Sequence, residues 1–163
     1  MDFAQRLVAL SWESLGYFVV EGLCVGVREA DLLAIKLDEK DRISERIHIE
    51  VQVSANPAGV LRNKSQFGSS SKFPIESAGE FIKKKYKNEK IMKAISMRFK
   101  TDNYKRVFIH GRLKDKSQLK AFSNENIECI PIGKLVSEAL KANPVRELIR
   151  TVQVAELLKI VEP

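Results

Sequence analysis

Two carboxylates and one amide in the first third of the chain are placed where they could act together. Asp31 lies in a short apolar segment, and Glu50 and Gln52 lie in the segment 47–54, where apolar and polar residues alternate strictly. Such alternation is typical of a strand that buries one face, so Glu50 and Gln52 share the other face. The charged turn over 37–46 would fold the two segments into an antiparallel pair. We therefore expect Asp31 and Glu50 to converge on one site.

Two converging carboxylates are a suitable ligand set for Mg²⁺ or Mn²⁺. Mg²⁺ prefers hard oxygen ligands, keeps several waters and bridges to phosphates. The bound ion lowers the pKa of a water and offsets charge that builds on a phosphate under attack. Gln52 can orient a water through its amide but carries no charge. In the alternative interpretation, Asp31 caps a turn and Glu50 is an exposed strand residue. His48 shares the face of Glu50 and could either approach the site or serve only the structure.

The order of these segments resembles the PD-(D/E)xK nuclease superfamily, most closely its restriction-endonuclease and archaeal Holliday junction resolvase branches. That family opens its first strand with Gly-aromatic-x-Val, and residues 16–20 here read Gly-Tyr-Phe-Val-Val after a helix-like segment. Asp31 stands at the family's Asp position, and residues 50–52 (Glu-Val-Gln) stand at its Glu-x-Lys position. The resemblance implies a metal-dependent nuclease that hydrolyses DNA phosphodiesters. In it, Asp31 and Glu50 would bind Mg²⁺ or Mn²⁺, with residue 52 beside the attacking water.

Two departures from the family pattern support a second interpretation. Gln52 replaces the usual lysine. The first helix of the family often supplies an acidic residue, but Gln5 lies nearest to that position and Glu13 is too close to the helix end. The chain could therefore be a catalytically degenerate nuclease-fold protein that binds nucleic acid or a protein partner.

The positive charge of the chain is concentrated in one stretch. The net charge is +7 and the pI about 9.4, which favours a polyanionic partner. Residues 82–106 contain ten basic and two acidic residues, a net charge of +8. We interpret this stretch as a footprint for the DNA backbone. A solvated helix surface or an acidic protein partner are the alternatives. The candidate nucleic-acid contacts are Lys72, Lys83, Lys84, Lys87, Lys90 and Lys93.

The remaining segments predict a single α/β domain with a central mixed β-sheet flanked by helices, a restriction-endonuclease-like core. Strand-like and helix-like segments alternate after residue 105, which implies parallel pairing with right-handed crossovers. We expect helices over 75–99, 117–122 and 133–142, and strands over 106–111 and 128–132. Residues 1–143 would form the nuclease-like core. Residues 144–163 would form a helix that packs on this core or on a second subunit in a homodimer.

Other features narrow the cellular setting. Residues 55–74 have no clear period and follow the Glu50 strand directly, so they would hang over the proposed site. Cys24 and Cys129 have no CxxC spacing, which favours reduced thiols. No apolar run reaches the roughly 18 residues that a membrane span needs. We expect a cytoplasmic protein with no membrane partner.

Overall fold

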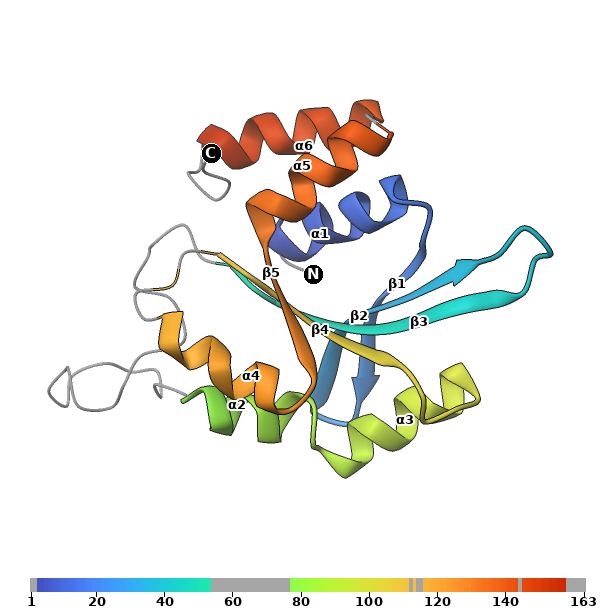
Figure 1. Cartoon of the computed structure of the whole chain (residues 1–163), viewed down its shortest axis with the longest axis vertical. Coiled ribbons are helices and arrows are strands. Elements are labelled where there is room, and N and C mark those ends of the chain that lie inside the picture. The colour runs from blue at the N-terminus through green and yellow to red at the C-terminus, as the bar shows by residue number, and fades with distance from the viewer. Residues whose placement is uncertain (1–2, 54–76, 112, 114–115, 144, 158–163) are drawn as a thin grey trace, which may run out of the picture.

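Five strands form one sheet and lie in it in chain order (Figure 1). The computed structural model describes residues 3–53, 77–111, 113, 116–143 and 145–157. The first three strands are an antiparallel meander, and the last two add to it in parallel. Tight turns allow the antiparallel pairs, whereas parallel pairs need longer crossovers. The strands are β1 (Phe18–Val25), β2 (Arg28–Leu37), β3 (Ile43–Gln52), β4 (Lys105–His110) and β5 (Ile127–Pro131).

Helices cover both faces of this sheet, so the predicted single α/β domain with a mixed sheet is confirmed. One face carries α1 (Phe3–Ser14), α5 (Ile132–Ala142) and α6 (Arg146–Leu157). The other face carries α2 (Ala78–Lys85), α3 (Glu89–Phe99) and α4 (Leu119–Asn124), which a 3₁₀ turn over Lys116–Gln118 precedes. No helix in the described ranges is long and apolar enough to cross a membrane.

The alternation along β3 assigns its two faces to different surroundings. Ile47, Ile49 and Val51 belong to the buried cluster that α1, α5 and α6 complete. His48 and Glu50 lie on the opposite face, in contact with residues at the end of α2. The strand predicted from its period of two therefore has the predicted faces. Its polar face is covered by a helix rather than by solvent, because Glu50 is fully buried.

Two predicted segments are divided differently in the structure. The Gly-aromatic-x-Val segment over 16–20 is only the start of a longer strand, because β1 continues to Val25 and the turn lies at Gly26, whose φ is +63°. β1 continues as a strand through Gly22, although this residue has a φ of +66°. The register places Gly22 opposite Asp31. The helix predicted over 75–99 is two helices, because α2 ends at Lys85 and a new N-cap starts α3.

The C-terminal helix α6 packs against α1. Leu148, Val152 and Ala155 are buried in the cluster shared with α1 and α5. Arg6 of α1 also bridges two elements, because its guanidinium lies 3.0 Å from Glu21 of β1 and 2.7 Å from Glu147 of α6. Residues 158–163 lie outside the described ranges, as does the whole 55–74 segment that was expected to hang over the site.

Candidate functional site

The register of β2 and β3 brings Asp31 and Glu50 together. Leu32 pairs with Ile49 and Leu33 with His48, so the same register sets Asp31 opposite Glu50. Oδ2 of Asp31 accepts a hydrogen bond of 2.9 Å from the Val51 amide, which fixes that carboxylate against the neighbouring strand. Asp31 is 8% exposed and Glu50 is not exposed at all. The predicted convergence of the two carboxylates is therefore present, at a site almost closed to solvent.

A lysine from α2 lies between these carboxylates. Nζ of Lys85 is 2.9 Å from Oδ1 of Asp31 and 2.6 Å from Oε2 of Glu50. It also donates a hydrogen bond of 3.1 Å to the carbonyl oxygen of Glu29. Within the described ranges, Oε2 of Glu50 accepts no hydrogen bond of good geometry, and the ion pair with Lys85 compensates its charge. Two carboxylates and one backbone carbonyl thus hold a single cation.

Lys85 was not among the site residues predicted from the sequence, where it was grouped with the basic stretch. The helical spacing of apolar residues could have indicated that Lys85 faces the protein interior. Ala78, Phe81 and Ile82 are the buried residues of α2, and position 85 continues this stripe at the same spacing. A lysine on an apolar stripe must find a buried counter-charge or leave the helix face. Here the counter-charges are Asp31 and Glu50.

His48 holds the other oxygen of Glu50. Its Nε2 lies 2.8 Å from Oε1 of Glu50, and its ring centroid lies 5.0 Å from that of Tyr86. Burial lowers the pKa of His48 to about 3, so the ring is neutral at neutral pH. A neutral ring must carry its proton on Nε2 to donate to the carboxylate. His48 therefore contacts the site and orients Glu50. This agrees with the first of the two roles considered for His48, an approach to the site.

Burial brings the titration of the two carboxylates close to neutrality. It raises the pKa of Asp31 to about 6, with a further rise from Glu50 and a partial offset from Lys85. It raises the pKa of Glu50 to about 7, again offset by Lys85. Burial alone would lower the pKa of Lys85, but the two carboxylates outweigh it and the net shift is upward. The lysine thus stays charged while its partners exchange protons near neutral pH.

The third predicted site residue, Gln52, is at the end of β3. Strand alternation sets it on the face of Glu50, and it is half-buried. Among the described residues, no hydrogen bond joins its side chain to Asp31, Glu50 or Lys85. Its register partner on β4 is His110, whose Nδ1 donates to the Gly111 carbonyl at 2.8 Å. The positively charged group at the site is therefore Lys85 of α2, not a residue at position 52.

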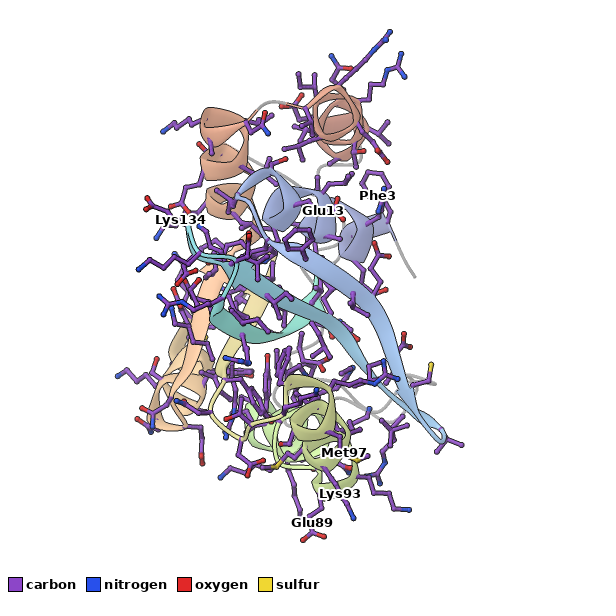
Figure 2. The ribbon with its side chains drawn as sticks, turned by 90° about the vertical axis from the view of Figure 1, so that its right-hand side faces the viewer. Phe3, Glu13, Glu89, Lys93, Met97 and Lys134 are labelled. Atoms are coloured by element: carbon purple, nitrogen blue, oxygen red, sulfur yellow. The ribbon has the colours of Figure 1, made fainter. Side chains whose placement is uncertain are left out.

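The predicted nucleic-acid contacts that the structure describes line two grooves, with Lys90 and Lys93 three residues apart on α3. Figure 2 shows Lys93 on α3 extending away from the sheet, and it lines a shallow groove with Lys100 and Arg106. Lys105, another member of the stretch, is 2.7 Å from Glu45. Lys72 lies outside the described residues. The other predicted contacts line a separate groove beside the β1–β2 turn: Lys83, Lys84, Lys87 and Lys90.

The carboxylate pair offers a small donor set to a divalent cation. No group of three or more His, Cys, Asp or Glu side chains within the described ranges is arranged to hold a metal. The ammonium of Lys85 is nevertheless a cation bound by three oxygens, two of them from carboxylates. Oxygen ligands of this kind suit Mg²⁺ and Mn²⁺, with waters completing the shell.

No family model, curated protein or solved structure matches this chain.

Proposed function

We propose that this protein is a metal-dependent nuclease that hydrolyses DNA phosphodiesters, with a PD-(D/E)xK-type, restriction-endonuclease-like core. The observation that supports it best is the convergence of Asp31, Glu50 and Lys85. These three residues supply two metal-ligating carboxylates and one cation, the same chemical groups as the Asp, Glu and Lys of that family's motif. The lysine comes from α2 instead of from the Glu-x-Lys strand, which gives Gln52 a smaller role.

In this proposal each residue of the site has one role. Asp31 and Glu50 would hold Mg²⁺ or Mn²⁺, and the ion would supply an activated water and offset charge on the phosphate. His48 keeps the Glu50 carboxylate in one orientation through its hydrogen bond. With the ion in its place between the carboxylates, the Lys85 ammonium would be available to stabilise charge on the phosphate. Gln52 hydrogen-bonds water without adding charge.

A second function has its own support in the same contacts. Lys85 already compensates both carboxylates, and a protein that uses this ion pair only for stability needs no metal. The chain would then be a degenerate nuclease-fold protein that binds nucleic acid or a partner. The nuclease and the nucleic-acid-binding form of the second function both predict DNA binding, but only the nuclease predicts cleavage.

Single-turnover cleavage of duplex, branched and single-stranded DNA with Mg²⁺ or Mn²⁺ separates the two. We expect wild type to cut at least one substrate. Glu50→Gln should lower the rate by roughly 100-fold or more, because a ligand and its charge are lost. Glu45→Gln is the matched control, since Glu45 is on the same strand but pairs with Lys105 near its exposed end. Its rate should equal that of wild type.

Gln52→Lys tests whether the lysine of α2 has taken over the family role. If Lys85 already supplies the charge, a second lysine should change the rate by less than about tenfold. If neither wild type nor Gln52→Lys cuts any substrate while both still bind DNA, the nuclease proposal gives way to the binding module.

A further inference from the structure

An open groove lies between the β1–β2 turn and the corner where α2 meets α3. Figure 1 shows that turn next to the junction of the two helices, on the face of the sheet that carries the carboxylates. The groove has a volume of about 730 Å³. The turn contributes residues 25–28 to its lining, and the helices contribute Glu80, Lys83, Lys84 and residues 87–90.

The groove carries positive charge that the protein does not compensate. Its lining includes five basic and two acidic residues. Arg28, Lys83 and Lys90 are exposed and make no hydrogen bond or ion pair with any described residue. Of the two acids, Glu80 already closes the capping box of α2 with Ser77. Three like charges around one hollow repel one another, so a polyanion in the groove would relieve that repulsion.

The groove lies near the carboxylate pair, although Asp31 and Glu50 are not part of its lining. Arg28 starts this strand and Asp31 lies three residues further on. At a strand rise of about 3.3 Å per residue, their Cα atoms are separated by roughly 10 Å. Between them, the Glu29 carbonyl accepts the hydrogen bond from Lys85. The helix that presents Lys85 to Asp31 also presents Lys83 to the groove.

We infer that this groove binds the phosphodiester backbone of a nucleic acid strand and leads it to Asp31 and Glu50. The second half of this inference rests on the proposed function, whereas the first does not. A nucleic acid fits better than an acidic protein because none of the described residues that line the groove is aromatic. The large apolar residues among them are limited to Val25 and Val27, whereas protein interfaces concentrate large apolar and aromatic groups at their centres.

The test is the salt dependence of duplex DNA affinity, measured by fluorescence anisotropy without divalent metal. Each neutralised phosphate contact adds about 0.9 to the slope of log affinity against log salt. The triple variant Arg28→Gln/Lys83→Gln/Lys90→Gln should lower that slope by about 2 to 3. Between about 50 and 200 mM salt, the variant should therefore lose roughly 40-fold less affinity than wild type.

The matched control removes the same charge from the other face of the sheet. Lys141, Arg146 and Arg150 are exposed on α5 and α6, and their triple Gln variant should keep the wild-type slope. Equal effects of the two triple variants would overturn the inference, because net charge alone would explain binding. Displacement of DNA by poly-glutamate at equal charge concentration would overturn the choice of nucleic acid.

Cleavage gives a separate readout for the approach to the carboxylates. The groove variant should cut slowly at low DNA concentration and at the wild-type rate at saturation. A rate that stays low at saturation contradicts delivery by the groove. If wild type cuts no DNA at all, the proposed function fails, and the salt slopes still decide whether the groove binds the backbone.

Discussion

Lys85→Met is the substitution that tests the charge balance of the site most directly. The change keeps an unbranched side chain of similar length and removes the one cation that, among the described residues, contacts both carboxylates. The Lys85 side chain is 19% exposed and that of Glu50 is fully buried, so solvent screens the pair little. Removal of one partner from a buried ion pair typically costs about 3–5 kcal/mol. We expect a loss of that size in the free energy of unfolding at about pH 8.

The loss should shrink as the pH falls. Without Lys85, the pKa values of Asp31 and Glu50 should rise above the values of about 6 and about 7 that they have beside the lysine. The folded variant then binds more protons than its unfolded chain, whose carboxyls titrate near pH 4. Its free energy of unfolding therefore increases as the pH decreases towards that value. At about pH 5 the deficit should be about 1 kcal/mol, the size of the lost hydrogen bonds.

Divalent metal should restore part of the free energy of unfolding that Lys85→Met loses. A ligand that binds only the folded state adds about 2.7 kcal/mol at a concentration of 100 times its Kd. Mg²⁺ or Mn²⁺ should therefore stabilise Lys85→Met more than wild type, in which the ammonium competes for the same oxygens. Urea unfolding curves at the two pH values, with and without metal, give all the free energies needed.

Lys87→Met is the control for this series. Lys87 is two residues away and pairs with Glu125 at 2.7 Å, but both side chains are more than a third exposed. Its loss should cost less than about 1 kcal/mol at either pH, with no response to metal. If Lys85→Met behaves like this control, Lys85 does not compensate the buried charges of Asp31 and Glu50.

Two further predictions concern metal binding. Calorimetry with Mn²⁺ should show a binding isotherm for wild type that Asp31→Ala abolishes, and identical isotherms would remove Asp31 from the ligand set. The affinity for Mn²⁺ should also increase as the pH rises through about 6 to about 7, because Asp31 and Glu50 must lose their protons to bind it. Over the same interval the metal-free protein should lose stability, since these raised pKa values favour folding only while the carboxyls are protonated. If neither the Mn²⁺ affinity nor the stability of the metal-free protein changes over this pH range, Asp31 and Glu50 are not the titrating metal ligands.

Local sequence patterns were sufficient to predict the sheet and the carboxylate pair. The period of two along β3 is a property of consecutive residues, so it identifies the buried face without any tertiary information. The short charged turn before it predicts the antiparallel pairing that sets Asp31 opposite Glu50. The alternation of strands and helices after residue 105 likewise predicts parallel pairing, and β4 and β5 pair in that way.

The lysine and the division of the basic stretch could not be predicted in the same way. Lys85 acts at the site because α2 packs over β3, and that contact joins residues far apart in the sequence. In the sequence it is one of three consecutive lysines, and only the apolar stripe of α2 distinguishes it from Lys83 and Lys84. The N-cap at Asn88 starts α3 as a helix distinct from α2, so the basic run is distributed over two helices and the start of β4.

Gly22 shows that the site constrains a residue that contributes no side chain to it. A Cβ atom at this position would lie 2.8 Å from Oε1 of Glu29, a distance that real Cβ contacts essentially never show. Its φ of +66° adds a backbone cost of about 1–2 kcal/mol for any other residue. The Glu29 carboxylate is the far end of an exposed, flexible side chain and can move aside, so the backbone conformation carries the larger cost. Because the register places Gly22 opposite Asp31, that cost falls on the part of β1 that lies beside the site.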